Sequence, residues 1–152
     1  MPRVRRLLCV YYGFLALLAF VGTWGHNVAY LRPDEGPIGG FVAATARFWP
    51  ETLATPASTS ITVDLGVLTL AASIWMLIEA RRLAIRLPWL YVVFGFLVAI
   101  SVTFPLFLIA RERALAARGE STDTLGLGHL DIVGLFLVGG AAVVFTLWTL
   151  AR

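Results

Sequence analysis

The chain has 152 residues, of which 59% are hydrophobic and only 14% carry a charged side chain. A soluble domain carries roughly 25% charged residues, so this composition excludes a protein whose whole surface faces water. The net charge of +3 comes from arginines without any lysine, and they flank apolar runs rather than form one patch, which argues against nucleic acid as a partner.

Four apolar segments follow one another, at about residues 7–30, 56–78, 88–110 and 132–151. Each supplies the ~20 residues that a helix needs to cross the ~30 Å hydrocarbon layer. Barrel strands are much shorter, and in lipid a helix satisfies its own backbone hydrogen bonds. The sequence therefore predicts a single all-α domain, an integral membrane bundle of four transmembrane helices.

The start of the chain has the features of a retained helix rather than of a secretory signal. Arg3, Arg5 and Arg6 precede an uncharged run from Leu7 to Trp24, which is 18 residues long. That run exceeds the apolar core of a usual signal peptide, and no small-x-small cleavage site follows it. We therefore expect the first segment to stay as a membrane helix.

The loop between the first two segments contains a further amphipathic stretch. Phe41, Val42, Thr45, Phe48 and Trp49 recur at helical spacing there. Aromatic side chains on an amphipathic helix are typical of the lipid headgroup region. We expect a short interfacial helix in this first outer loop.

Asp64 is the most informative polar residue. Thr55 and Pro56 predict the start of the second helix, which places Asp64 about two turns inside it. Only 14 uncharged residues separate Asp64 from Glu79, and their ~21 Å cannot span ~30 Å of hydrocarbon. An ionisable group at such depth is first interpreted as part of a functional site. The alternative for Asp64 is a structural role, in which its side chain forms a hydrogen bond between two helices.

The other end of the same helix predicts a structural charge cluster. Glu79 is followed directly by Arg81 and Arg82. We expect inner-face ion pairs among these three residues, at the membrane surface.

Two pairs of polar residues near helix ends complete a candidate cluster with Asp64. His26 and Asn27 close the first segment, and His129 and Asp131 open the fourth. With Asp64 they form a candidate ligand-binding or proton-active site near the outer face. The alternatives are a helix-end residue for Asn27, an interface residue for His26 and a helix N-cap for Asp131. Axial haem ligation by the two histidines is a further alternative, although both lie near segment ends.

Pro105 lies well inside the third segment and frees the carbonyl group of Ser101. We therefore expect a helix kink at these two residues. The sequence contains no His-Glu-x-x-His metal motif and no phosphate-binding glycine loop, so we predict no metal site and leave the cofactor unassigned.

Orientation follows from the arginine count on each side of the membrane. With four crossings and the N-terminus inside, seven arginines lie inside and five outside. Positively charged loops favour the cytoplasm. We expect a multi-pass protein with both termini cytoplasmic.

From about residue 58 to 115 the chain resembles a family of small bacterial membrane proteins known as domain of unknown function 2834. The matching pieces, in order, are Asp64-Leu65, Glu79-Ala80-Arg81-Arg82-Leu83, Trp89-Leu90-Tyr91, Ser101, Phe104-Pro105-Leu106-Phe107-Leu108 and Arg111-Glu112-Arg113. The resemblance implies a helical protein of the bacterial inner membrane, and it implies no activity and no catalytic residue.

The leading functional hypothesis is a membrane protein that binds a lipid-like ligand or a partner subunit near its outer face. Its expected partners are membrane lipids and a second copy or another membrane subunit. One alternative is a small membrane enzyme acting on an isoprenoid or other lipid, with Asp64 as general acid or base. The other is a dimeric small-solute transporter with Asp64 as its proton-coupled group. Whether the protein is an enzyme therefore stays open.

Overall fold

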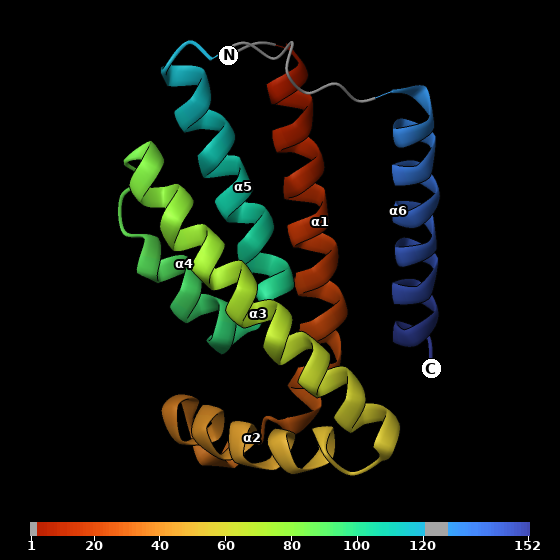
Figure 1. Ribbon diagram of the computed structural model, residues 1–152. Coiled ribbons are helices and arrows are strands. Elements are labelled where there is room, and N and C mark those ends of the chain that lie inside the picture. The colour runs from red at the N-terminus through yellow and green to blue at the C-terminus, as the bar shows by residue number, and fades with distance from the viewer. Residues whose placement is uncertain (1–2, 121–127) are drawn as a thin grey trace.

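The computed structural model describes residues 3–120 and 128–152 of the chain. Within that part every regular element is helical, and four helical segments are long and apolar enough to cross a membrane (Figure 1). The elements in chain order are α1 (Arg3–Asn27), two short 3-10 turns (Val28–Tyr30 and Pro33–Glu35), α2 (Pro37–Thr52), α3 (Pro56–Leu83), α4 (Pro88–Phe94), a π-helical stretch (Gly95–Ala99), α5 (Ile100–Ala117) and α6 (His129–Leu150). The predicted all-α fold with four candidate membrane spans is confirmed.

The third candidate span, Pro88–Ala117, reverses direction within its length. The rings of Tyr91 in α4 and Phe107 in α5 are 5.4 Å apart between centroids. In one straight helix these residues would be about 24 Å apart, since each residue adds 1.5 Å. Figure 1 shows α4 running down beside α3 and α5 returning to the level where α3 ends. The segment is therefore a helical hairpin, where the sequence predicted one straight helix over 88–110.

The reversal occurs at the junction of the π-helical stretch and α5. Ala99 has an extended backbone, with φ 179° and ψ 140°, which ends one helical direction and begins another. Gly95 allows the two arms to approach, because a Cβ there would lie 3.1 Å from Oγ1 of Thr103 and 3.2 Å from Cδ1 of Ile100. The expected kink at Pro105 and Ser101 is replaced by a reversal that precedes both residues, and Pro105 lies inside α5.

The hairpin changes which chain segments share one end of the bundle. From Pro88 to Ala99 the descending arm has 12 residues, about 18 Å of helix, which is shorter than a ~30 Å hydrocarbon layer. The first residues of α1 and the last residues of α3 and α5 therefore meet at one end, which we call the arginine end. The opposite end, where α2 lies, is called the α2 end.

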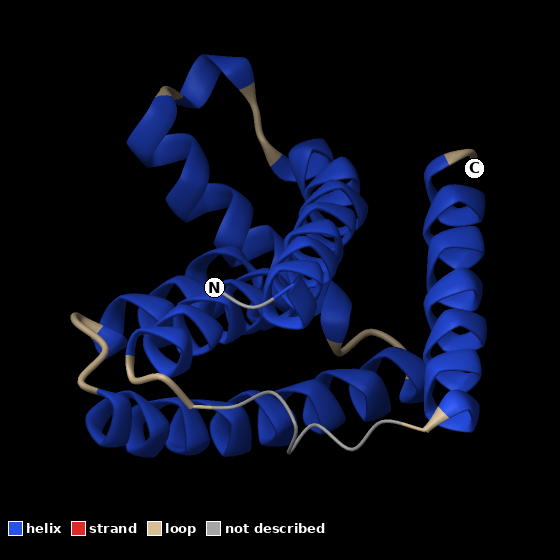
Figure 2. Ribbon diagram, turned by 90° about the horizontal axis from the view of Figure 1, so that it is seen from above, coloured by secondary structure: helices blue, strands red, loops and turns tan. Residues whose placement is uncertain are grey.

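Helix α6 runs parallel to α1. A Cβ on Gly139 would lie 2.9 Å from the hydroxyl of Tyr11, and one on Gly22 would lie 2.9 Å from Cγ2 of Thr146. Residues later in α1 thus contact residues later in α6. Figure 2 shows α6, marked by the C-terminus, standing beside the other helices. The start of α1 and the end of α6 therefore lie at opposite ends of the bundle, whereas the sequence predicted both termini on one side. The difference arises because the third span reverses direction.

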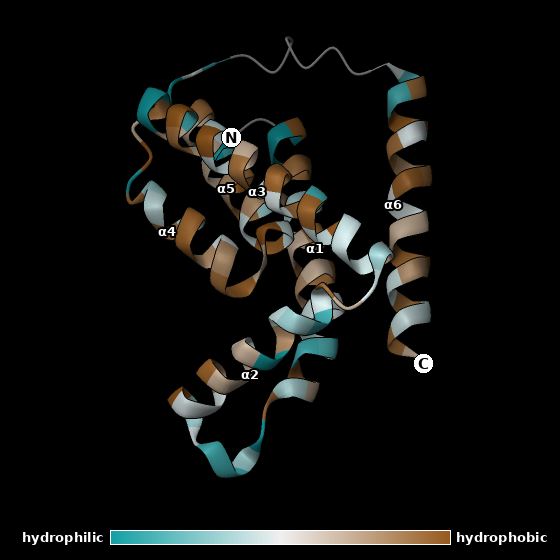
Figure 3. Ribbon diagram, turned by 60° about the horizontal axis from the view of Figure 1, so that its bottom comes forward, coloured by the Kyte–Doolittle hydropathy of each residue, from teal (hydrophilic) through white to brown (hydrophobic). Residues whose placement is uncertain are grey.

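Helix α2 lies across the α2 end of the bundle (Figure 1) and corresponds to the short helix expected in the first loop. Its outward residues are apolar, with Ile38 83%, Val42 63% and Trp49 51% exposed. Figure 3 shows hydrophobic and hydrophilic residues alternating along α2, whereas α6 is hydrophobic over most of its length. This distribution suits a helix that lies at a membrane surface rather than one that crosses it.

The start of α3 is fixed by the residues that predicted it. Thr55 is the N-cap, its side chain accepts a hydrogen bond from the Ser58 backbone at 3.1 Å, and the Ser58 hydroxyl accepts one from the Thr55 backbone at 3.1 Å. Pro56 occupies the first turn, where its missing N–H costs nothing. Reciprocal capping of this kind satisfies two of the free N–H groups at a helix start.

The core lies between α3 and the hairpin. Its buried members are Met76 and Ala80 of α3, Val92 of α4 and Phe107 of α5. The Phe107 ring makes edge contacts with Trp75 and Tyr91, with centroids 5.7 and 5.4 Å away. The hairpin is thus packed on α3 by aromatic contacts.

Candidate functional site

A network of charges, buried at Arg5 and Glu112 and partly exposed at Arg82 and Arg111, joins three helices at the arginine end. Arg5 of α1 donates a hydrogen bond from Nη1 to Oε2 of Glu112 in α5, at 2.6 Å, and both side chains are almost fully buried. Nη2 of Arg5 also donates to the backbone carbonyl of Glu120 at 3.1 Å. Arg111 donates to the second oxygen of Glu112 at 2.9 Å. Glu112 is therefore held between two guanidinium groups.

The network continues onto α3 through Arg111. This residue donates from Nε to Oε1 of Glu79 at 2.8 Å. Arg82 donates two bonds of 2.7 Å to the same carboxylate, from Nε and Nη2. Two carboxylates thus bridge three arginines from α1, α3 and α5. The expected pair of Glu79 with Arg82 is present, and Arg81 is exposed on the same helix.

Sequence reasoning missed the larger part of this network. The prediction of one straight helix in the third segment places Arg111 and Glu112 on the opposite side of the membrane from Glu79. The partners of Arg5 and Glu79 lie 107 and 32 positions away, so no local spacing indicates them. The available signal was the distribution of arginines, since placing Arg111, Arg113 and Arg118 at the same end as the other basic segments gives a larger imbalance between the two ends.

An apolar groove runs along the hairpin, next to this network. Its volume is about 420 Å³, and its lining residues come from the α3–α4 connection, α4 and α5: Arg86, Leu87, Leu90, Tyr91, Phe94, Thr103 and Leu106. Arg86 and Leu87 lie at the arginine end, whereas Phe94 and Thr103 lie near the tip of the hairpin. The groove therefore has a cation at its mouth and apolar walls along its length.

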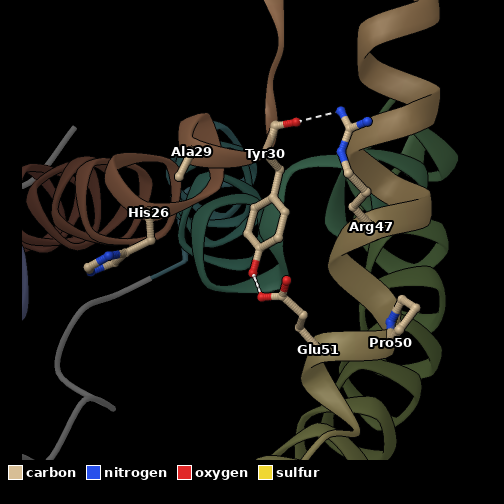
Figure 4. Close-up of a pocket in the computed structure, with 6 residues that line it drawn as sticks. All are labelled: His26, Ala29, Tyr30, Arg47, Pro50 and Glu51. Atoms are coloured by element: carbon tan, nitrogen blue, oxygen red, sulfur yellow. Dashed lines mark hydrogen bonds between the residues drawn. The ribbon is translucent and has the colours of Figure 1, made fainter.

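A second hollow, of about 680 Å³, lies at the α2 end between the last turns of α1 and α2 (Figure 4). Arg47 donates to the backbone carbonyl of Tyr30 at 2.7 Å and to both oxygens of Glu35 at 2.8 and 2.9 Å. The hydroxyl of Tyr30 donates to Glu51. These bonds fasten α2 to the chain segment that follows α1.

The same contacts set the acidity of Glu35, which lies in the connection before α2. Hydrogen bonds from Arg47 hold the pKa of the Glu35 carboxyl below its ordinary value. In turn, Glu35 raises the pKa of Arg47. Both groups stay charged at neutral pH, so the fastening of α2 is complete there.

The structure separates the five residues of the predicted outer cluster. His26 and Asn27 end α1 at the α2 end, whereas His129 and Asp131 begin α6 at the arginine end, because α1 and α6 are parallel. Figure 4 shows the His26 ring turned away from the pair formed by Tyr30 and Glu51. Oδ2 of Asp131 accepts a hydrogen bond from the backbone N–H of Gly128 at 2.8 Å, so Asp131 stabilises the start of α6 from inside its first turn, whereas the N-cap position itself is occupied by Gly128. One site containing all five residues is therefore not formed within this bundle.

Asp64 lies in α3, two turns after Pro56, and its side chain is exposed. The residues of α3 that face the bundle are Thr69, Ser73, Met76 and Ala80, all buried. On a helix with 3.6 residues per turn, Asp64 projects from the opposite side to Ser73. Within the described residues no side chain forms a hydrogen bond or ion pair with it.

Comparison with known proteins adds one finding. Residues 11–113 match the model of a family described as "Protein of unknown function DUF2834". The chain belongs to this family. The DUF2834 region contains α2, α3, the whole groove and most of the hairpin, together with Glu79, Arg82, Arg111 and Glu112 of the network, but it ends before α6. No curated protein and no solved structure matches the chain.

Proposed function

We propose that this protein is a membrane-embedded binding protein for an anionic, lipid-like molecule, which it holds in the groove of the α4–α5 hairpin. The observation that carries the proposal is the combination of an apolar groove with Arg86 at its mouth. The expected site near the outer face remains a prediction. Of its five residues only His26 lines the hollow at the α2 end, where Tyr30, Arg47 and Glu51 already form hydrogen bonds.

Charge supports an anionic head group. Arg86 is exposed and has no carboxylate partner within the described part of the chain. The residues around it at the arginine end are also basic. Basic pockets between membrane helices attract the head groups of anionic lipids, and each exposed arginine near a membrane surface contributes about 1 kcal/mol.

The walls of the groove support an alkyl or isoprenoid chain. From Leu87 to Phe94 the groove follows about 10 Å of helix, and leucine and aromatic side chains line it. Binding sites for small molecules are mostly apolar with a few polar groups that fix orientation. Here Arg86 binds the head group, and the hydroxyl of Thr103 lies at the far end of the groove.

The test is lipid retention by the purified full chain, measured by native mass spectrometry. Equal amounts of phosphatidylglycerol and phosphatidylcholine are offered, and inorganic phosphate is offered separately. We expect preferential retention of the anionic lipid and no retention of phosphate alone. Arg86→Ala should weaken retention about fivefold, the equivalent of ~1 kcal/mol, because it removes the cation at the groove mouth.

Arg81→Ala is the matched control, since Arg81 is an exposed arginine at the same end but does not line the groove. Leu90→Trp is a second variant that fills the groove and keeps Arg86. Equal retention by the wild type and both groove variants contradicts the proposal. Loss of retention in Arg81→Ala to the same extent as in Arg86→Ala assigns the effect to overall charge and contradicts it as well.

The arginines also predict how the protein is oriented in the membrane. Because of the hairpin, nine arginines lie at the arginine end and three at the other: Arg3, Arg5, Arg6, Arg81, Arg82, Arg86, Arg111, Arg113 and Arg118 against Arg32, Arg47 and Arg152. The positive-inside rule favours the cytoplasm for the larger group. The N-terminus is then cytoplasmic and the C-terminus external, in the inner membrane.

A further inference from the structure

One surface of α3 combines a carboxylate, a hydroxyl group and small residues, and it faces away from the bundle. Residues spaced three and four apart form a stripe along α3, and all of them are exposed: Ala57, Ser60, Asp64, Leu68 and Ala71. The buried residues Thr69, Ser73 and Met76 occupy the other side of the helix. Within the described residues no other helix covers the stripe.

The depth of Asp64 makes this exposure costly. Glu79 is fixed at the arginine end by Arg82 and Arg111, and Asp64 lies about 22 Å from it along α3. At its other end α3 begins directly after α2, and Asp64 lies about 12 Å beyond Pro56. The two levels are about 34 Å apart along α3, and the tilt of α3 (Figure 1) brings their separation across the membrane closer to the ~30 Å of hydrocarbon. Asp64 therefore lies inside the layer that these two levels bound.

A carboxyl group at such a depth requires a partner other than lipid. Ionisable residues in membrane helices almost always face protein or a water-filled cavity and pair with another polar group. The described part of the bundle supplies neither for Asp64, because no helix covers its side of α3. A surface of another protein molecule must therefore meet the stripe.

We infer that the stripe is the contact surface between two copies of this chain. Ser60 and Asp64 are one helical turn apart, so two α3 helices related by a two-fold axis can exchange equivalent bonds. The hydroxyl of Ser60 in each copy donates to the carboxyl group of Asp64 in the other. Ala57 and Ala71 let the two backbones approach, as small residues do at helix contacts in membranes. Such reciprocal contacts are the signature of a symmetric dimer.

The experiment measures dimer formation by the full chain in lipid vesicles, in a Cys9→Ser background. Ala57→Cys is placed on the stripe, and Gly66→Cys is the control, since Gly66 is exposed on another side of α3. We expect oxidative cross-linking between copies through position 57 and not through position 66. The protein-to-lipid ratio is then varied to obtain the dimer dissociation constant.

Two substitutions test the polar contact itself. Asp64→Leu should raise the dimer dissociation constant about tenfold or more, because it removes both reciprocal bonds. Ser60→Ala should weaken the dimer in the same direction, while Asp64→Asn should stay close to the wild type because its amide oxygen still accepts. A monomer at every protein-to-lipid ratio, equal cross-linking through both positions, or an Asp64→Leu dimer as tight as the wild type would overturn the inference.

Discussion

Replacing Glu112 with leucine is expected to lower the free energy of unfolding by about 3–5 kcal/mol. Glu112 is 2% exposed, and its two oxygens accept from Arg5 and Arg111 at 2.6 and 2.9 Å. Leucine at this position leaves two neighbouring guanidinium groups without the carboxylate between them. Arg5 is the more affected, since it is itself buried, whereas Arg111 keeps its bond to Glu79. Unfolding in mixed micelles, followed by circular dichroism, measures the change.

A double variant separates the charge effect from packing. Arg5→Met combined with Glu112→Leu removes both charges and keeps similar side-chain volumes. Replacing a buried ion pair by apolar residues is often neutral, whereas removing one partner is costly. The double variant should therefore be more stable than Glu112→Leu alone. A double variant as unstable as the sum of two costly single changes would mean that the pair does not act as a unit.

Phe107→Ala is expected to cost about 3–5 kcal/mol through the cavity that it leaves. The Phe107 side chain is fully buried between α3 and the hairpin, in ring contact with Trp75 and Tyr91. Loss of the ring removes its contacts with Trp75 of α3 and Tyr91 of α4. The same unfolding measurement detects it.

The matched control is Phe136→Ala in α6. Phe136 is 73% exposed, so its side chain is not part of a core within the described residues. The two variants remove the same atoms, so their difference reports burial alone. Similar effects of both substitutions would show that Phe107 is not buried by a hairpin core.

The four candidate membrane spans and the amphipathic helix α2 were predictable from the sequence because both depend on local composition. Residues 7–30 and the other long apolar runs need no partner to be recognised as helices in lipid. The α2 pattern of Phe41, Phe48 and Trp49 likewise indicates an amphipathic helix by itself. The capping residues Thr55 and Pro56 determined the start of α3 in the same local way.

The hairpin was not predictable from hydropathy, since residues 88–110 form one uncharged run with no break in its apolar character. Its reversal depends on the close fit of Gly95 against Thr103 and on the extended backbone of Ala99, which are properties of tertiary packing. The arginine distribution carried an indirect signal. When Arg111, Arg113 and Arg118 are counted on the same side as the other basic loops, the excess of arginines on that side becomes large instead of small.

The polar residues show the same division. Glu79 and Arg82 are three positions apart and were paired correctly by local reasoning. The depth of Asp64 in the membrane stays a prediction. The grouping of His26 with His129 depended on the direction of α6 relative to α1. That direction depends on whether the third span reverses, so the prediction of a straight third helix also grouped residues that the structure places at opposite ends of the bundle.

Labelling of single cysteines in sealed vesicles is the most direct test of the reversal in the third span. In a Cys9→Ser background, Arg86→Cys and Arg118→Cys mark the two ends of the hairpin, and Arg152→Cys marks the C-terminus. With a hairpin, a membrane-impermeant thiol reagent should reach positions 86 and 118 from the same side and position 152 from the opposite side. Labelling of positions 86 and 118 from opposite sides would contradict the reversal.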